Sequence, residues 1–435
     1  MKKVELMAPA KNIKSIKAGL KFADSFYFGA KEFNMRAQAD NFTKEELDRA
    51  VRLCHDNGLK AYLTTNILIY ENELNDILQT IEYANGINFD AVIVHDIAAI
   101  QYAKDIGIPF HISTQANISN SMSAKFYEDL GASRLILARE CSLERIKEIK
   151  GKLSKAELEV FVHGAMCTSI SGRCYFSQDV CGSEEFSANR GRCVQPCRRQ
   201  WRVIDEENNE YIYDGERFLN SRDLCAIELI PEMIDAKIDA FKIEGRMRDP
   251  HYVEVTTKIY RQAIEAYYNG SFSTDSKKMV GKWIYELKKE YNRGFTTGFY
   301  VKRVTQEDQQ HKSPTNLSHW RLIKMGTITG YSKNQKEAKV QLNNGRIRKG
   351  MVVLIQGGAG SDTYFNQKIT SIEIDGSKVE STSKATENNP FDVWINVDEG
   401  VRPNKIDHIY IFTEKTYKHR MSKKPKKKKA DYYKL

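Results

Sequence analysis

Apolar and polar positions alternate in two different ways along this chain of 435 residues. Up to about residue 245, short apolar runs are separated by segments in which apolar residues recur every three or four positions. Short runs are typical of buried strands, and the longer period is that of helices covering a sheet. We find eight such runs, at residues 4–9, 25–29, 60–66, 90–96, 109–115, 134–139, 159–164 and 240–245. This part of the chain is therefore predicted to consist of β–α units with a parallel sheet.

Eight β–α units within residues 1–270 have the size and count of a (β/α)8 barrel. An open, doubly wound sheet is the alternative, but no Gly-x-Gly-x-x-Gly motif follows the first strand to favour it. We therefore predict an α/β fold with a TIM-like barrel. In such barrels the active site lies at the C-terminal ends of the strands.

Polar residues gather at the predicted C-terminal strand ends. A single one of them is more often a helix cap or turn residue than a ligand. Their recurrence at strand after strand nevertheless favours a shared pocket. These residues are Thr64, Thr65, Asn66, His95, Asp96, Ser113, Thr114, Gln115, Arg139, Glu140, His163, Glu244 and Arg246.

One connection interrupts the regular spacing of the units. About 75 residues separate the seventh apolar run from the eighth, and five of the eight cysteines fall within them. Long loops on the catalytic face of a barrel are usually functional. We predict that residues 165–225 form a cysteine-rich insertion after the seventh strand.

The pattern changes after the predicted barrel. Residues 271–320 are predicted to form a helical extension and a polar linker. Six short β runs within residues 321–413 predict a small C-terminal β-barrel domain. Residues 414–435 form a basic tail that carries most of the net charge of +10. Such a tail is predicted to be disordered, either as a solvated segment or as an arm that binds RNA phosphates.

The composition, 41% hydrophobic and 29% charged, is that of a soluble globular protein. No run approaches the ~18 apolar residues of a membrane span, and the first apolar run is too short for a signal peptide. We therefore expect a cytoplasmic protein without a membrane partner. Thiols stay reduced in that compartment, so a disulfide framework is the less favoured reading of the cysteines.

Four of the clustered cysteines have the spacing Cys167-x6-Cys174-x18-Cys193-x3-Cys197. The usual zinc patterns rely on Cys-x2-Cys pairs or paired histidines, and this spacing matches none of them. Four thiolates on an irregular, glycine-rich loop are what an iron–sulfur cluster requires. A structural zinc ion and redox-active thiols remain alternatives. Cys181 is a fifth candidate to which the pattern gives no role.

Arginines surround the last two cysteines in the segment NRGRCVQPCRRQWR, which contains no acidic residue. Planar guanidinium groups suit the recognition of carboxylates and phosphates. Trp201 could stack on a nucleic-acid base. A solvated loop surface is the alternative, but five arginines beside a metal site favour anion binding.

Several long stretches of the sequence resemble the collagenase-like peptidase family, also called peptidase family U32. The resemblance covers nearly the whole chain. It rests above all on GAMCTSISGRCYFS (164–177), STQANISN (113–120), NRGRCVQPCR (189–198) and FKIEGRMRDPHYV (241–253). The better-understood members are oxygen-independent hydroxylases. One group makes 5-hydroxyuridine at the tRNA wobble position using prephenate, a longer group modifies a cytidine of rRNA, and shorter members act in quinone biosynthesis.

The chain length and the single C-terminal β domain are most similar to the tRNA group. The resemblance implies a 4Fe-4S cluster on Cys167, Cys174, Cys193 and Cys197, and prephenate as co-substrate. Because prephenate carries two carboxylates, we expect arginines to hold it, with Arg36, Arg173, Arg192, Arg198 and Arg246 as candidates. Glu244 and His163 are candidates for proton transfer. The expected macromolecular partners are the tRNA anticodon stem-loop and proteins that assemble the cluster and donate electrons.

Three alternatives remain: a collagenase-like peptidase, a hydroxylase acting on rRNA and a zinc-stabilised RNA-binding module. The peptidase alternative lacks the usual motifs, because the sequence contains neither His-Glu-x-x-His nor Gly-x-Ser-x-Gly.

Overall fold

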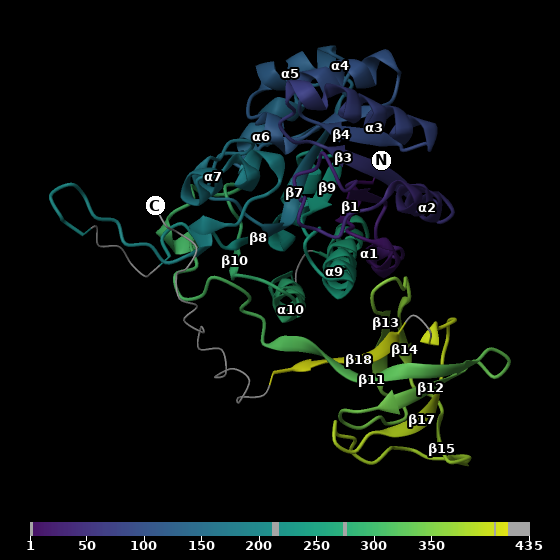
Figure 1. Cartoon of the computed structure of the whole chain (residues 1–435). Helices are drawn as coiled ribbons and strands as arrows, with labels where there is room; N and C mark the ends of the chain where they lie inside the picture. The colour runs from purple at the N-terminus through teal and green to yellow at the C-terminus, as the bar shows by residue number, and fades with distance from the viewer. Residues whose placement is uncertain (1–2, 211–216, 273–275, 404–405, 416–435) are drawn as a thin grey trace. The chain divides into compact units, whose positions relative to one another are not determined.

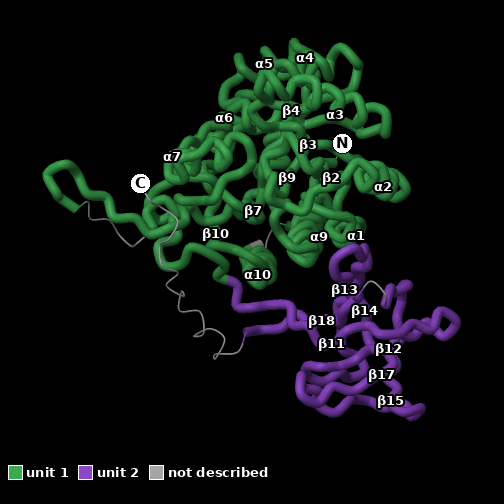
Figure 2. The backbone as a smooth tube through the Cα atoms, viewed as in Figure 1, with its two compact units in different colours: residues 1–317, 430–435 green, residues 318–429 purple. Residues whose placement is uncertain are grey.

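The computed structural model describes residues 3–210, 217–272, 276–403 and 406–415. Two compact units are present: the first extends to Leu317 and the second begins at Ser318 (Figure 2). The predicted basic tail, residues 414–435, lies outside the described residues except for its first two positions. Within the described ranges, no helix is long and apolar enough to cross a membrane.

The first unit contains a closed barrel of eight parallel strands, which confirms the predicted fold (Figure 1). Each strand pairs with the next, and β9 pairs with both β7 and β1, which closes the barrel. The strands are β1 (Glu5–Pro9), β2 (Ser25–Phe28), β3 (Lys60–Thr65), β4 (Ala91–Val94), β5 (Phe110–Ile112), β6 (Arg134–Ile136), β7 (Glu157–Ala165) and β9 (Ala240–Ile243).

Helices alternate with these strands and bury one face against them. Most begin at a polar residue that accepts a hydrogen bond from the first turn. At α2, Thr43 accepts from the Glu46 backbone N–H while the Glu46 carboxylate accepts from the Thr43 N–H, which is a complete capping box. These helices are α1 (Ile13–Gly19), α2 (Lys44–His55), α3 (Leu74–Gly86), α4 (Ile97–Asp105), α5 (Ser121–Asp129), α6 (Leu143–Lys150), α8 (Ile230–Asp235) and α9 (Pro250–Tyr268).

The connection from β7 to β9 is the long one that the sequence predicts. It contains the short helix α7 (Phe176–Cys181) and the strand β8 (Asp223–Cys225), which runs antiparallel to the end of β7. Strand β10 (Phe295–Thr296), which follows helix α10 (Ser276–Lys289), pairs with β8. The sheet is therefore extended on the side where the cysteine-rich insertion begins.

The half of the barrel interior near the N-terminal ends of the strands holds paired charges. The buried Arg134 guanidinium donates to both carboxylate oxygens of Glu5, at 2.9 and 2.8 Å, and to Glu159 at 3.2 Å. Lys242 donates to the other oxygen of Glu159 at 2.9 Å. We call this group, completed by Glu157 beside Arg134, the floor network.

The second unit is a separate antiparallel sheet with the strand order β14-β13-β18-β11-β12-β17-β15-β16. Its own apolar core includes Ile328, Val340 and Ile409, all nearly inaccessible. All six predicted β runs contribute to its strands. The strands are β11 (Trp320–Ser332), β12 (Glu337–Leu342), β13 (Val352–Gly357), β14 (Tyr364–Lys368), β15 (Ile372–Ile374), β16 (Ser377–Lys378), β17 (Phe391–Asn396) and β18 (Asp407–Glu414).

Candidate functional site

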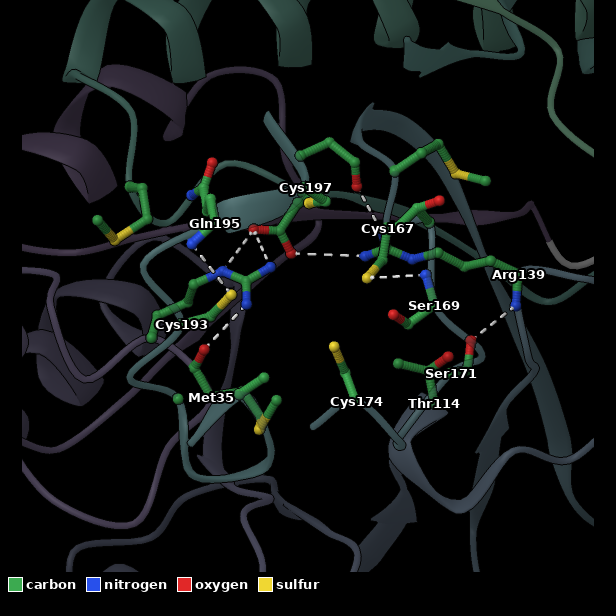
Figure 3. A pocket seen from close by; sticks show the side chains of 18 of the residues that line it. Met35, Thr114, Arg139, Cys167, Ser169, Ser171, Cys174, Cys193, Gln195 and Cys197 are labelled. Carbon is green, nitrogen blue, oxygen red and sulfur yellow. Dashed lines mark hydrogen bonds and ion pairs between the residues drawn. The ribbon is translucent and has the colours of Figure 1, made fainter. Parts of the chain in front are cut away.

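A cavity of about 360 Å³ lies at the C-terminal ends of the barrel strands (Figure 3). Its walls come from the loop after β2, the loop after β5, the end of β6, the cysteine-rich insertion and the segment after β9. We call it the mouth cavity. Its location is where a (β/α)8 barrel carries its active site.

Two glycines allow the insertion to lie directly on the barrel loops. Gly172 has φ +86°, and a Cβ atom there would lie 2.0 Å from the carbonyl oxygen of Gln115. Gly191 has φ +78°, and a Cβ atom there would lie 2.4 Å from the carbonyl oxygen of Asn34. A side chain at either position would push the insertion away from the barrel, so both positions require glycine.

An ion pair fastens the same insertion to the loop after β3. Arg190 donates to both carboxylate oxygens of Glu73, one of them at 2.8 Å, and to the carbonyl oxygen of Leu68 at 2.9 Å. Its guanidinium also lies 4.4 Å from the centroid of the Tyr70 ring. Arg190 therefore holds the insertion in place, and its N–H groups donate to Glu73 and Leu68 rather than pointing into the cavity.

Four thiols line the mouth cavity: those of Cys167, Cys174, Cys193 and Cys197 (Figure 3). None of them is in a disulfide bond. Burial raises the pKa of Cys193, and it raises the pKa of Cys197 to about 11. These two groups are therefore neutral thiols at pH 7, and a bound metal would have to displace their protons.

Backbone groups are aimed at two of the sulfurs. The N–H of Ser169 donates to Cys167 at 3.4 Å, and the N–H of Gln195 donates to Cys193 at 3.3 Å. Hydrogen bonds to the ligand sulfurs are one of the means by which proteins tune iron–sulfur clusters. The donor set is thus suited to such a cluster.

The spacing of the side chains is a separate matter. Among the described residues, no three His, Cys, Asp or Glu groups lie close enough together in this structure to hold a metal ion.

Cys181 lies apart from this set. It is half-buried at the end of α7 and does not line the mouth cavity. The geometry thus separates the four predicted ligands from the fifth cysteine.

On the barrel side of the cavity, one carboxylate is surrounded by guanidinium groups. The Nε of Arg36 donates to Oε1 of the buried Glu244 at 3.1 Å, and an Arg139 nitrogen lies 3.7 Å from Oε2. Arg246 donates to Asn34 at 3.1 Å and to Thr64 at 2.9 Å. The side chains of Arg36, Arg139, Arg246 and Glu244 line a smaller adjoining cavity of about 60 Å³, and all but Arg246 also line the mouth cavity. We call Arg36, Arg139, Arg246 and Glu244 the mouth cluster.

Burial alone would raise the pKa of Glu244, but attraction from Arg36, Arg139 and Arg246 outweighs burial and lowers it. Burial lowers the pKa of Arg246 to about 10. Glu244 is therefore a carboxylate and the three arginines are cations at neutral pH. The mouth cluster carries a net positive charge next to an open cavity, which is an arrangement that attracts an anion.

The predicted arginines fall in different places. Arg36, Arg173 and Arg198 line the mouth cavity, and Arg36 and Arg246 line the smaller one. Arg192 is exposed and lines neither. Arg198 is buried and donates to Asn220 at 2.9 Å and to the carbonyl oxygens of Ser221 and Met166, both at 2.6 Å, so it ties loops of the insertion together.

Arg139 is the member of the mouth cluster that the sequence did not single out as an anion ligand. Its guanidinium lies 4.0 Å from the centroid of the Phe161 ring and donates to the carbonyl oxygen of Ala165. The only signal in the sequence is its position at the end of the sixth strand.

His163 does not line the mouth cavity. It is buried among Tyr252, Tyr260 and Phe295, with Nδ1 3.3 Å from the Tyr260 hydroxyl. The cause is a bulge in β7: the pairing with β9 skips from Phe161 to His163, and this extra residue turns His163 to the other face of the strand. Burial lowers its pKa to about 4, so it is neutral at pH 7. The geometry gives it no contact with the cavity.

The fold and the site define a (β/α)8-barrel protein whose mouth carries four thiols and a cluster of arginines. The chain belongs to peptidase family U32, whose family model matches residues 11–310. It is 39% identical to an uncharacterized protease of Methanocaldococcus jannaschii over 94% of this chain and 98% of that protein.

Two further relatives carry different names. A collagenase of Porphyromonas gingivalis is 34% identical over 94% of this chain and 98% of that protein. The tRNA hydroxylation protein P1 of Bacillus subtilis is 33% identical over 79% of this chain and 81% of that protein.

Proposed function

We propose that this protein is a tRNA-modifying enzyme that hydroxylates C5 of the wobble uridine to give 5-hydroxyuridine. The observation that carries the proposal is the mouth cavity, which is lined both by four thiols and by the guanidinium groups of Arg36 and Arg139. The name of the Bacillus relative supports RNA hydroxylation as the reaction. The co-substrate in this proposal is prephenate, and the cofactor is a 4Fe-4S cluster on Cys167, Cys174, Cys193 and Cys197.

Hydroxylation replaces the C5–H bond of the base by a C5–OH bond and removes two electrons from the base. The reaction therefore needs a two-electron oxidant and a source of the oxygen atom. We assign the oxidant to prephenate, which either transfers an oxygen atom to the base or accepts the two electrons while water supplies the oxygen atom and releases its protons. When bound, the cluster would supply one-electron chemistry beside the two substrates.

The roles of the chain's own residues follow from their positions. Arg36, Arg139 and Arg246 would bind the carboxylates of the co-substrate, because bidentate guanidinium–carboxylate pairs fix orientation as well as charge. Arg173 is exposed at the rim of the cavity and would meet the same ligand or a phosphate. Glu244 would position the arginines and accept a proton from the site.

The target base has to leave its stack to reach a cavity of this kind. A wobble uridine lies in a single-stranded loop, where extruding a base costs less than in a duplex. This substrate therefore suits the site better than a paired nucleotide does. The protein's partners in this proposal are the anticodon stem-loop, a cluster-assembly system and an electron donor.

Two of the relatives carry protease or collagenase names, so a peptidase is the second candidate. A cysteine nucleophile requires a base to activate it. Among the described residues that line the mouth cavity and the two cavities beside it, none is a histidine. The cavity chemistry thus favours the hydroxylase.

Nucleoside mass spectrometry of bulk tRNA tests the proposal. We expect 5-hydroxyuridine and nucleosides derived from it to disappear in a deletion strain, to return with the wild-type gene and to stay absent with Cys193→Ala. Unchanged nucleosides in a deletion strain that lacks paralogues would refute the proposal. Loss of a modified rRNA cytidine instead would assign the enzyme to rRNA.

The cofactor is tested separately by iron and sulfide analysis of protein purified without oxygen. Cys193→Ala is expected to lose most of its iron, whereas Cys181→Ala is the matched control and is expected to keep it. A wild-type protein that contains zinc and no iron would contradict the cluster and favour the zinc-stabilised RNA-binding module.

A further inference from the structure

A hollow of about 450 Å³ adjoins the mouth cavity within the first unit. The two share Gln38, Cys193, Gln195, Arg198 and Tyr291 as lining residues, so they lie side by side. We call the hollow the side groove. Its remaining lining residues are Val194, Arg199, Arg217, Pro314 and Thr315.

The side groove is basic. Arg198, Arg199 and Arg217 contribute to its wall, and none of its lining residues is an aspartate or a glutamate. Arg198 is committed to Asn220, Ser221 and Met166, but its charge remains next to the groove. A concave surface with several cations and no carboxylate attracts a polyanion, and arginine is suited to phosphate groups.

Tyr291 stands at the junction because it lines both the mouth cavity and the side groove. The Arg248 guanidinium lies 3.5 Å from the centroid of its ring. On the same loop, Arg293 is buried and paired with the buried Asp223 at 2.6 Å, which anchors the loop to β8. The ring is therefore held in a defined position at the entrance to the cavity.

We propose that the side groove binds the nucleotide next to the modified uridine, with Tyr291 at the boundary between the two nucleotides. Arg199 and Arg217 contact the phosphates of this segment, while the target base occupies the mouth cavity. Arg248 covers one face of the ring, so a single base stacks on Tyr291, and such stacking tolerates any base. This inference rests on the proposed function, since it takes an RNA substrate as given.

The test measures the affinity of the full-length protein for a fluorescently labelled anticodon stem-loop. Fluorescence anisotropy reports the binding, and the affinity is determined at several salt concentrations. The variants are the double substitution Arg199→Gln with Arg217→Gln, and Arg145→Gln as the control, since Arg145 is exposed on α6 and lines no cavity described above. Each lost phosphate contact is expected to reduce the slope of log affinity against log salt by about 0.7. The double variant should therefore lose about 1.4 in slope, and the control should lose nothing.

The stacking role has its own pair of variants. Tyr291→Phe keeps the ring and should bind RNA as the wild type does, whereas Tyr291→Ala should bind roughly tenfold more weakly or worse. Iron content is measured for every variant, because Arg199 is close in sequence to Cys197. A variant that keeps its iron and loses RNA affinity supports the assignment.

The outcomes separate this inference from the proposed function. If the wild type modifies tRNA but the double variant binds the stem-loop with an unchanged salt slope, the side groove is not the RNA site and the inference fails alone. If the wild type neither binds nor modifies the RNA, the proposed function itself fails. Binding of an acidic peptide in place of RNA, lost in the double variant, would overturn the inference in favour of a peptide groove.

Discussion

The two ends of the barrel interior use buried charges for different purposes. In the floor network, Arg134 and Lys242 donate to the carboxylates of Glu5, Glu157 and Glu159, and Lys60 lies 3.6 Å from Glu5, so cations and carboxylates are equal in number. In the mouth cluster, three arginines share the single carboxylate of Glu244 and border an open cavity. A buried group of charges whose partners are all present is structural, whereas one with excess charge beside a cavity is prepared for a ligand.

The strongest prediction concerns the floor network. Arg134→Leu would remove the buried guanidinium that neutralises Glu5 and Glu159, leaving Lys60 and Lys242 as their remaining cations, and we expect the barrel to lose about 3–5 kcal/mol of stability. Chemical denaturation followed by circular dichroism measures this loss. Arg145→Leu on the exposed face of α6 is the control and should change stability by less than ~0.5 kcal/mol. An unshifted unfolding transition in Arg134→Leu would mean that the floor network is not structural.

The next prediction concerns the mouth cluster, where function rather than stability should change. Arg139→Gln is expected to raise the KM for the dicarboxylate co-substrate about 10- to 100-fold, as the loss of a charge-assisted hydrogen bond implies. Its stability should stay close to that of the wild type. Arg192 lines neither cavity, so Arg192→Gln should leave KM unchanged. Equal KM values for the two variants would show that the mouth cluster does not bind the co-substrate.

The smallest effect is expected in the pH dependence of folding stability that Glu5 causes. Burial raises the pKa of Glu5, but the hydrogen bonds and charge of Arg134 outweigh it and hold the pKa far below its ordinary value. A depressed pKa stabilises the fold at pH values above about 4.5, and the stabilisation is lost as pH falls below that value. One proton corresponds to a slope of about 1.4 kcal/mol per pH unit. Glu5→Gln should therefore show a shallower loss of stability between pH 4.5 and pH 3, and an equal slope would contradict this account of Glu5.

The sequence predicts the architecture well because strand and helix periods are local properties. All eight barrel strands lie where their apolar runs are, and the long connection after the seventh strand carries the cysteines as expected. Strand β14 was missed because only Tyr364 and Phe365 are consecutive apolar residues there. Its place in the sheet depends on pairing with β13.

The site is harder to predict because it depends on where side chains point. A one-residue bulge in β7 turns His163 away from the cavity, and no period in the sequence reveals it. Arg198 lies in a segment that reads as a basic surface loop, but backbone carbonyls at Ser221 and Met166 draw it into the interior. Arg139 joins the mouth cluster through contacts with Glu244 and Phe161, which lie far from it in the sequence.

The most direct test of the central claim is a reaction reconstituted without oxygen. Iron-loaded protein, an anticodon stem-loop and prephenate are combined, and the RNA is analysed by mass spectrometry. We predict that the wobble uridine gains one oxygen atom, only when prephenate is present and not with Cys193→Ala. Unmodified uridine with fully loaded protein and prephenate, together with cleavage of gelatin by the same preparation, would contradict the claim and assign the cavity to proteolysis.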